Sequence, residues 1–467
     1  MRLVIIGAGI AGLSAAIEAA RGGIKEIVVV DSESRAGGKI HTLHRDGRIF
    51  EAGPDAFLRR NPVGLALVES LGLTGNLTAP SASSALLYAN GRLHPMPREL
   101  AMGVPTDPIA PLKTTSVPIL SRLRASVGIS IGLKGDPSTD SLGYLCQRRL
   151  GRRFSELVVD PLIGGINAGS VFGSSMELVA PQLGSALTAP PIGPTKLLRR
   201  SVGTQKIRTA PTAPVFGSLS GGLSELVEAM VAELCALGVE FKFQTAALSM
   251  EKFGERIRLH LGRNDGVESE LDSDMVVVAV PSGPASGLLA GLSKVASGRL
   301  GQIRYSSVAL TVLGFRGVRN PLPAGISGVL SPARERTLTT AVSIASSKWP
   351  SWAEPDELLL RVSAGRMADQ RFQNLDDEDL SDLISKEASR IVGLPSVSEP
   401  SFTKVIRWHD ALPQFRPHHS ALIASARSIL ANETGSKVAM AGSYMYGSGI
   451  PASIGSGIRA IGDLKLN

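Results

Sequence analysis

Cysteines are nearly absent from the chain, which has only Cys146 and Cys235 in 467 residues. Two cysteines do not make the disulfide framework of a small secreted protein, so we expect a reducing, cytoplasmic setting. Aromatic residues make up 4% of the sequence, and no zinc-finger or RNP-like pattern is present. This scarcity argues against nucleic acid as a partner, because bases are held largely by aromatic stacking and groove readout. The seven histidines show no metal-ligand spacing, so we expect no metal site.

Long apolar segments are scarce as well. One long uncharged stretch, residues 275–293, contains Pro281, Pro284 and several glycines, so we do not expect it to cross a bilayer. The apolar N-terminus has no basic region of any length, and it predicts a first strand and helix rather than a secretory signal. No serine-hydrolase pattern is present either, because the glycine and serine clusters lack the spacing of a nucleophile elbow.

What the chain does have is typical of a folded globular protein. Of its residues, 43% are hydrophobic and 19% are charged, and the length predicts two or three lobes around a sizeable core. The formal net charge of +8 admits anionic ligands or an anionic membrane surface.

The N-terminal residues predict a dinucleotide-binding unit. The apolar runs Leu3–Ile6 and Glu26–Val30 indicate strands on either side of a helix over residues 13–20. Residues 7–12 between them have the G-x-G-x-x-G pattern, whose glycines permit a tight turn and the close approach of a pyrophosphate to a helix N-terminus. Asp31 follows the second strand, where a carboxylate can accept hydrogen bonds from ribose hydroxyls.

A second glycine-containing block, Arg35-Ala36-Gly37-Gly38-Lys39 followed by Thr42, comes directly after this unit. Adjacent glycines let the backbone pass close to a cofactor's phosphates or flavin, and Arg35 or Lys39 could compensate phosphate charge. The block resembles the R-x-G-G-[RK]-x-x-T sequence of the superfamily of flavin-containing amine oxidases and protoporphyrinogen oxidases.

Further blocks extend the resemblance along nearly the whole chain and narrow it to the FAD-dependent porphyrinogen oxidase family. They are Phe50–Phe57, similar to E-x-G-P-[DN]-[SA]-F; Asp160–Gly169, similar to P-L-x-x-G-[IV]-x-A-G; Phe216–Leu223, similar to F-x-x-L-x-G-G-[LY]; and Arg407–His419, similar to R-W-x-x-x-x-P-Q-[YF]-x-x-x-H. Tyr446–Pro451 resembles the family's closing turn against the flavin, but Ala452 and Ser453 stand where an acidic residue and a cysteine are usual. This departure removes the grounds for giving a carboxylate or thiol a role there.

The resemblance implies a mixed fold, α/β with α+β parts, in three regions. A Rossmann-like FAD-binding domain of the amine oxidase type would comprise residues 1–78, 210–290 and 401–467. A substrate-binding domain with a mixed sheet would comprise residues 79–97 and 291–400. Residues 98–209 would form an inserted helical lobe, for which peripheral contact with the inner face of the membrane stays open.

The same resemblance implies FAD as the cofactor and assigns a set of residues to it. The set is Gly7, Ala8, Gly9, Ile10, Ala11, Gly12, Asp31, Ser32, Arg35, Gly38, Lys39, Gly53, Pro54, Asp55, Ala56, Ala247, Trp408, Ser448, Gly449 and Ile450.

A porphyrinogen, a flexible macrocycle with propionate arms, is the implied substrate. Arg92 is the first candidate partner for a propionate, followed by Asn61 and Lys348, and Gly169 is expected beside the substrate. No catalytic residue is singled out, because the protein supplies position and electrostatics while the flavin carries the redox chemistry.

Three segments bear on which porphyrinogen is oxidised. Residues 93–97, 102–106 and 348–350 look most like the enzymes of monoderm bacteria, which act on coproporphyrinogen III in haem biosynthesis. The resemblance implies the removal of six hydrogens in three two-electron steps, with O2 as the acceptor giving H2O2. It also leaves open a partner enzyme of the haem pathway.

Other readings remain open. Within the family, the alternative is a protoporphyrinogen IX oxidase, and more distant ones are a flavin amine oxidase or a carotenoid desaturase. A flavoprotein-like, membrane-associated scaffold without turnover is suggested only by Ala452 and Ser453.

Overall fold

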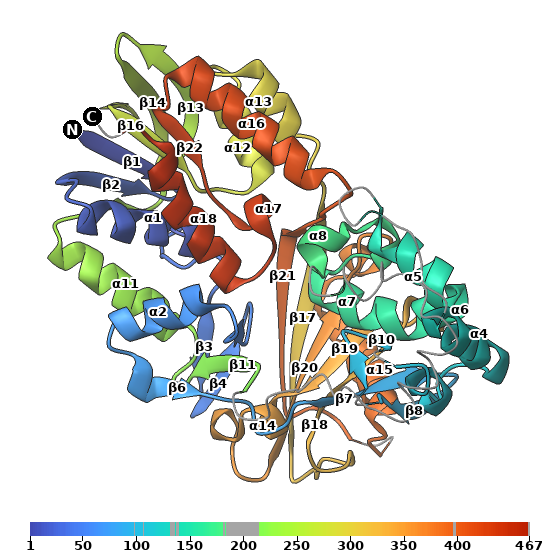
Figure 1. The fold of residues 1–467 in the computed structure, drawn as a ribbon. Helices are drawn as coiled ribbons and strands as arrows, with labels where there is room; N and C mark the ends of the chain where they lie inside the picture. Colours follow the sequence, from blue (N-terminus) through green and yellow to red (C-terminus); the bar gives the residue numbers. More distant parts are fainter. Residues whose placement is uncertain are drawn as a thin grey trace. The chain divides into compact units, whose positions relative to one another are not determined.

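The computed structural model describes residues 1–97, 99–105, 107–130, 136, 140–180, 183, 214–395 and 398–465. The chain has a mixed α/β fold that divides into two compact units (Figure 1). Unit 1 comprises Met1–Ala79, Val215–Arg304 and His419–Asn467, and unit 2 comprises Pro80–Pro214 and Tyr305–His418.

Unit 1 is built on a five-stranded sheet in the order β12-β2-β1-β16-β22, in which every neighbouring pair is parallel. Its strands are β1 (Arg2–Ile6), β2 (Glu26–Val30), β12 (Glu240–Lys242), β16 (Met275–Val278) and β22 (Val438–Met440). The three central strands are runs of valine, isoleucine and leucine with little exposure on either face. Continuous apolar runs of this kind are typical of parallel strands covered on both sides.

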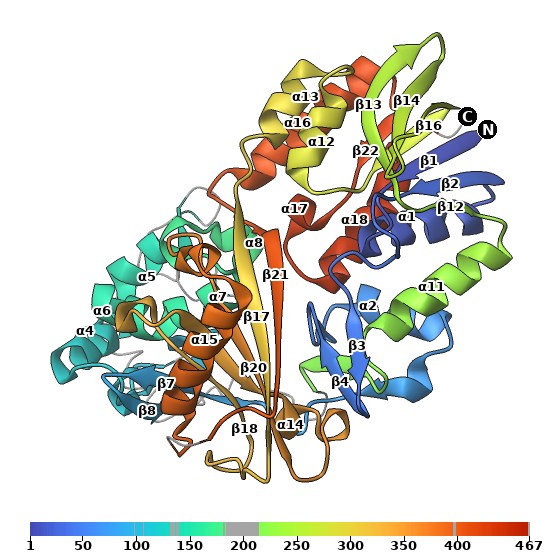
Figure 2. The same cartoon turned by 180° about the vertical axis from the view of Figure 1, so that it is seen from behind.

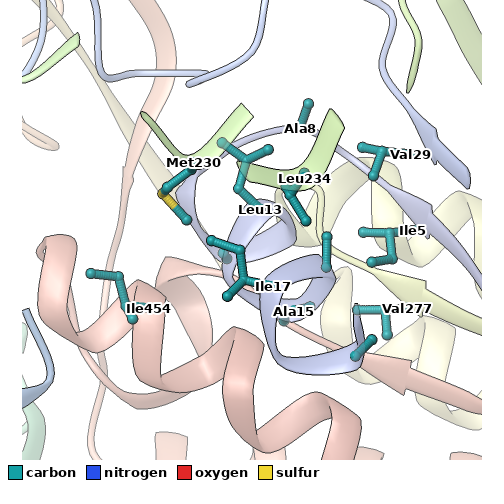
Figure 3. Close-up of a cluster of buried hydrophobic side chains, with 14 of the residues drawn as sticks. Ile5, Ala8, Leu13, Ala15, Ile17, Val29, Met230, Leu234, Val277 and Ile454 are labelled. Atoms are coloured by element: carbon teal, nitrogen blue, oxygen red, sulfur yellow. The ribbon is translucent and has the colours of Figure 1, made fainter. Parts of the chain in front are cut away.

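Three helices cover one face of this sheet. They are α1 (Ile10–Arg21), α11 (Ser224–Ala236) and α18 (Ile450–Asp463), whose Leu13, Ile17, Met230, Leu234 and Ile454 pack in one core with Ile5, Val29 and Val277 of the strands (Figure 3). Helices α1 and α18 approach closely, because a Cβ at Gly457 would lie 2.1 Å from the carbonyl oxygen of Ala11. Only glycine permits this contact.

The other face of the sheet carries the antiparallel strands β13 (Thr245–Phe253), β14 (Arg256–Arg263) and β15 (Glu268–Ser273), together with α16 (His419–Thr434). The rest of unit 1 consists of short elements around this frame: β3 (Thr42–Arg45), β4 (Arg48–Glu51), β5 (Phe57–Leu58), β6 (Leu77–Thr78), β11 (Phe216–Leu219), α2 (Pro62–Ser70), α12 (Ser282–Leu289), α13 (Lys294–Leu300) and α17 (Ser443–Tyr446).

Unit 2 contains a seven-stranded sheet in the order β21-β17-β20-β19-β18-β7-β8, mostly antiparallel. Its strands are β7 (Ser84–Ala89), β8 (Arg92–Pro95), β17 (Tyr305–Arg316), β18 (Ile326–Leu330), β19 (Thr339–Ile344), β20 (Glu357–Ala364) and β21 (Phe402–Pro413). Helix α15 (Asp377–Val392) packs on one face of this sheet (Figure 2). The helix begins where Asp376 accepts a hydrogen bond from the backbone N–H of Asp379, and it ends at Gly393.

A cluster of short helices completes unit 2 and packs against Leu87 of β7. They are α3 (Ala110–Lys113), α4 (Ile119–Ser130), α5 (Leu142–Leu150), α6 (Arg152–Phe154), the π-helical turn η2 (Ser155–Val159), α7 (Asp160–Asn167) and α8 (Met176–Val179). In the part of the chain that the structure describes, no helix has both the length and the apolar character needed to cross a membrane.

Two segments fall in a different unit from the one that the sequence suggests. Residues 402–413 form β21, which pairs with β17 from Tyr305 to Gly314, so they belong to unit 2 rather than with the dinucleotide-binding segments. Helix α13 lies in unit 1, where it packs on α12 and α16, rather than with the substrate-binding segments. Residues 184–209 of the expected helical lobe lie outside the described residues.

Candidate functional site

The strand order of unit 1 reverses between β1 and β16. The chain leaves β1 toward β2 on one side of the sheet, and β22, the neighbour of β16, lies on the other side. Ligands of open α/β sheets bind where the order reverses in this way. Residues 7–12 follow β1 directly, and a Cβ at Gly7 would lie 2.8 Å from the carbonyl oxygen of Ala279, just after β16.

The glycines of this loop have different surroundings. A Cβ at Gly12 would lie 1.8 Å from the carbonyl oxygen of Gly7, so Gly12 is needed for the fold of the turn itself. Around a Cβ at Gly9, by contrast, no atom of the described residues other than Gly9 and its two chain neighbours lies within 4 Å. Gly9 precedes α1, and the first turn of this helix includes Ile10 and Ala11. Among the described residues, this turn has no acidic residue and no side-chain cap. The backbone N–H groups at this helix N-terminus are therefore placed for an anion.

Asp31 joins this loop to the end of the second strand. One carboxylate oxygen, Oδ2, accepts a hydrogen bond from the backbone N–H of Ala8 at 2.6 Å, and Oδ1 accepts one from that of Glu33 at 2.8 Å. Each oxygen has a further lone pair, so the carboxylate can still accept from ribose hydroxyls. The backbone of Asp31 also bonds Thr245, two residues before Ala247, so the structure brings Ala8, Asp31, the exposed Ser32 and Ala247 into one region.

The second glycine block lies against the first. The N–H of Gly37 donates to the carbonyl oxygen of Ala8 at 2.9 Å, and a Cβ at Gly38 would meet the Cα of Gly9 at 3.4 Å. A Cβ at Gly53 would lie only 1.7 Å from the carbonyl oxygen of Lys39, so Gly53, which precedes the half-buried Pro54, Asp55 and Ala56, packs directly on this block.

Arg35 contacts the backbone of its own loop. Its guanidinium donates to the carbonyl oxygens of Ala36 at 3.0 Å, Gly38 at 2.8 Å and Ile40 at 3.1 Å. Burial lowers the pKa of Arg35, and the charges of Glu33 and Asp31 oppose that shift. The bonds of Arg35 shape the glycine block, a role that the sequence did not indicate.

This geometry predicts that Arg35→Lys weakens dinucleotide binding nearly as much as Arg35→Leu. A lysine keeps the charge but lacks the planar fork that reaches three carbonyl oxygens. Losing such charge-assisted bonds costs about 1.5–3 kcal/mol, or roughly ten- to a hundredfold in affinity. Fluorescence titration with FAD, the cofactor that the sequence leads us to expect, measures the change. Wild-type affinity in Arg35→Lys would show instead that only the charge matters.

A turn near the C-terminus contributes a second helix N-terminus to unit 1. Residues Ser448 and Gly449 lead into α18, which begins at the buried Ile450. Gly449 has a φ of 108°. Apart from Gly449 and its two chain neighbours, no atom of the described residues lies within 4 Å of the position that a Cβ would take there. Like α1, α18 has no acidic residue in its first turn. Ser453, where the related family has cysteine, is buried, and its N–H donates to the carbonyl oxygen of Gly449.

The sequence patterns do not single out two residues that support these turns. Glu51 is fully buried, and its Oε1 accepts from the N–H of Leu223 at 2.6 Å and from the hydroxyl of Thr42 at 3.0 Å. His419 is buried at the start of α16, and its Nε2 donates to the carbonyl oxygen of Tyr444 at 2.7 Å, close to the C-terminal turn. In the sequence, only their positions within the family blocks indicate that Glu51 and His419 could have such a role.

The remaining expected residues lie in both units. Asn61 lies in unit 1, where its side chain accepts a hydrogen bond from the N–H of Val63 and so caps α2. The others lie in unit 2: Trp408 is half-buried in β21, Arg92 is exposed in β8, Lys348 ends α14 (Ala345–Lys348) with its ammonium 5.5 Å from the Trp349 ring, and Gly169 follows α7. The substrate candidates thus come from both units, Asn61 from unit 1 and Arg92, Lys348 and Gly169 from unit 2.

Comparisons with known proteins agree with the dinucleotide motif. Residues 10–463 match the family model of flavin containing amine oxidoreductases. Relatives named coproporphyrinogen III oxidase include one from Bacillus subtilis, 32% identical over 99% of this chain and 97% of its own, and one from Mycobacterium tuberculosis, 28% identical over 98% and 96%. A chloroplastic protoporphyrinogen oxidase of Nicotiana tabacum is 27% identical over 95% of this chain and 82% of its own.

Solved structures have the same fold. A protein from Exiguobacterium sp. 255-15 assigned as a protoporphyrinogen oxidase has a TM-score of 0.83 with 27% identity, covering 99% of this chain and 98% of its own. A UDP-galactopyranose mutase has a TM-score of 0.74 at 14% identity, covering 98% and 93%, and this likeness concerns the fold alone.

Proposed function

The chain belongs to the flavin-containing amine oxidoreductase family, and on that premise we propose that it is an FAD-dependent coproporphyrinogen III oxidase. The observation that carries the proposal is the full-length similarity to the relatives of that name, at 32% identity for the Bacillus subtilis protein. Family membership makes the chain an oxidoreductase with a flavin cofactor. The identity of the flavin as FAD, the porphyrinogen and the acceptor O2 are parts of the proposal.

The residues of unit 1 fit an FAD molecule. The open face at Gly9 and the uncapped N-terminus of α1 would hold the pyrophosphate, and Asp31 would accept from the ribose. The glycine block that Arg35 shapes and the open face at Gly449 would lie along the flavin. Ser32, Lys39, Gly53–Ala56 and Ala247 complete the proposed set in unit 1.

Bound flavin would supply the two-electron chemistry, leaving orientation and electrostatics to the protein. The N-terminus of α18 is the positive end of its helix dipole and has no acidic residue in its first turn. This end of the helix would stabilise a negative charge that lies beside it. Each two-electron step removes one hydride and one proton from the substrate, and O2 takes up the electrons as H2O2. No side chain is assigned as an indispensable acid or base.

The proposed substrate contacts come mainly from unit 2. Arg92, exposed in β8, and Lys348 offer charged donors to propionates, and Gly169 offers backbone without a side chain. Asn61 is a weaker candidate, because its NH2 group is a neutral donor, while its carboxamide oxygen caps α2.

Aerobic turnover tests the proposed function. Purified, FAD-loaded protein should release H2O2 and form fluorescent porphyrin with coproporphyrinogen III, and it should release no peroxide with a diamine or without substrate. Peroxide release with the diamine alone would favour the amine oxidase alternative. Turnover of protoporphyrinogen IX in preference to coproporphyrinogen III would favour the alternative within the family.

We also propose that the helices of residues 109–155 contact an anionic membrane surface. Ile119, Leu120, Leu123 and Val127 form an apolar stripe along α4 with exposed fractions of 59%, 77%, 48% and 54%. Residues 109–155 contain eight lysines and arginines but only two acidic residues. Exposed apolar side chains among basic residues are the usual features of a helix that lies at a lipid interface.

Vesicle co-sedimentation checks this contact. The wild type should bind phosphatidylglycerol vesicles more tightly than phosphatidylcholine vesicles, and the double variant Leu120→Ser, Leu123→Ser should lose at least about tenfold in affinity. Leu248→Ser, which changes a leucine of β13 with a similar exposure of 54%, is the matched control and should bind as the wild type does. Equal binding by the double variant and the wild type would refute the contact.

A further inference from the structure

We infer that Asp160 is a positioning residue that holds the turn of residues 167–171, here called the substrate turn, in the form needed for porphyrinogen binding. This inference rests on the proposed function, in which Gly169 of this turn lies beside the substrate. It gives a task to a buried carboxylate that the proposed mechanism does not otherwise use.

Asp160 is bonded to the substrate turn by one oxygen. Its Oδ1 accepts hydrogen bonds from the hydroxyl of Ser170 and from the backbone N–H of Val171, both at 2.9 Å. The side chain is 8% exposed, so little water competes with these bonds. Removing a buried acceptor of this kind leaves two donors without a partner, which is costly.

The turn itself has a strained form that needs such support. Ala168 has a φ of 46°, in the left-handed region that side chains other than glycine, asparagine and aspartate seldom adopt. A Cβ at Gly169 would lie 2.2 Å from Oε1 of Gln414, so Gln414 fits there only against a glycine. The Nε2 of Gln414 also donates to the carbonyl oxygen of Asn167 at 3.0 Å. The backbone N–H of Met367 donates to the carbonyl oxygen of Ala168 at 2.8 Å.

The helix that carries Asp160 is irregular immediately before it. Residues 155–159 form a π-helical turn, and Pro161 follows Asp160. A proline inside a helix has no N–H to donate and clashes with the carbonyl four residues earlier, which explains the wider turn. Single π-helical turns inside helices occur frequently at functional sites.

Arg366 supplies the compensating charge. Its guanidinium is half-buried, donates to the carbonyl oxygen of Ser331, and interacts electrostatically with Asp160 and Asp369. Burial raises the pKa of Asp160 and the charge of Glu156 adds to the rise, while Val171, Ser170 and Arg366 oppose it. Moderate acid therefore protonates Asp160 more readily than an exposed aspartate, which weakens its hold on the turn.

Steady-state kinetics of the FAD-loaded protein with coproporphyrinogen III test the inference. Asp160→Asn keeps the shape but loses the charge, and it should raise KM about tenfold with a much smaller change in kcat. Protonation of Asp160 should make the kcat/KM of the wild type fall at acid pH. This acid limb of the pH profile should be missing in Asp160→Asn. In Glu156→Gln, which removes a neighbouring negative charge, the limb should move to lower pH while KM at neutral pH stays unchanged. The flavin absorbance spectrum should be that of the wild type in both variants.

If Asp160→Asn oxidises the porphyrinogen with the wild-type KM and an unchanged acid limb, the inference is wrong and the proposed function still stands. Absence of porphyrinogen oxidation in the wild type would overturn the proposed function and this inference with it. If Asp160→Asn does not fold, Ser170→Ala decides, because it keeps the charge of Asp160 and removes one of the two bonds to it, together with the bond that the Ser170 hydroxyl accepts from the N–H of Phe172. Its KM should rise about threefold, and an unchanged KM would count against the inference.

Discussion

Gly9→Val is expected to abolish flavin binding while leaving the fold intact. Gly9 has an extended backbone, with a φ of −70° and a ψ of 172°, that valine adopts readily. Its new methyl groups would point into the open space beside the N-terminus of α1, where the pyrophosphate is proposed to lie. We expect at least about a hundredfold loss of FAD affinity, because the phosphates could no longer reach the helix N–H groups. Titration with FAD and thermal unfolding of the apoprotein together measure both effects.

Gly12→Ala is the matched comparison three residues away. Its Cβ would lie 1.8 Å from the carbonyl oxygen of Gly7, so the apoprotein should be destabilised by about 1–3 kcal/mol or more. The two variants thus separate a glycine required by the ligand from a glycine required by the fold. Wild-type FAD affinity in Gly9→Val would contradict the assignment of the site.

Coproporphyrinogen III is expected to exceed protoporphyrinogen IX in kcat/KM by about ten- to a hundredfold. The two molecules differ where propionates replace vinyl groups, so the favoured substrate has four carboxylates rather than two. Charge-assisted contacts from residues such as Arg92 and Lys348 would contribute about 1.5–3 kcal/mol each, whereas a vinyl group leaves them without a partner. Parallel steady-state assays with both porphyrinogens measure this ratio.

Arg92→Ala should lower the ratio mainly through slower turnover of coproporphyrinogen III. Arg319→Ala, which removes another exposed arginine of unit 2, should leave the ratio unchanged. An equal or higher kcat/KM with protoporphyrinogen IX in the wild type would refute the preference, although the protein would still be a flavin oxidase.

The dinucleotide unit could be predicted from the sequence because its signals are local. The strand expected at Glu26–Val30 is β2 with the same bounds, and the helix expected over 13–20 lies within α1. Apolar runs and a glycine turn between them are decided by neighbouring residues in the chain. The contact of Asp31 with Ala8, 23 residues apart, follows from the same parallel pairing of β1 and β2.

Other features depend on partners distant in the sequence. Residues 402–413 carry family motifs, yet their place is decided by pairing with β17, about a hundred residues earlier. The bonds of Arg35 to its own loop depend on the left-handed backbone at Gly37 and Gly38, which a pattern of residue types does not reveal. Asn61 precedes Pro62, a typical start of a helix, so its capping role could have been predicted from the sequence.

Anaerobic mixing of the FAD-loaded protein with coproporphyrinogen III tests the central claim most directly. The visible absorbance of the oxidised flavin should disappear as porphyrin forms, and admission of air should restore it with release of H2O2. A flavin that stays oxidised with coproporphyrinogen III but is reduced by an amine would contradict the account.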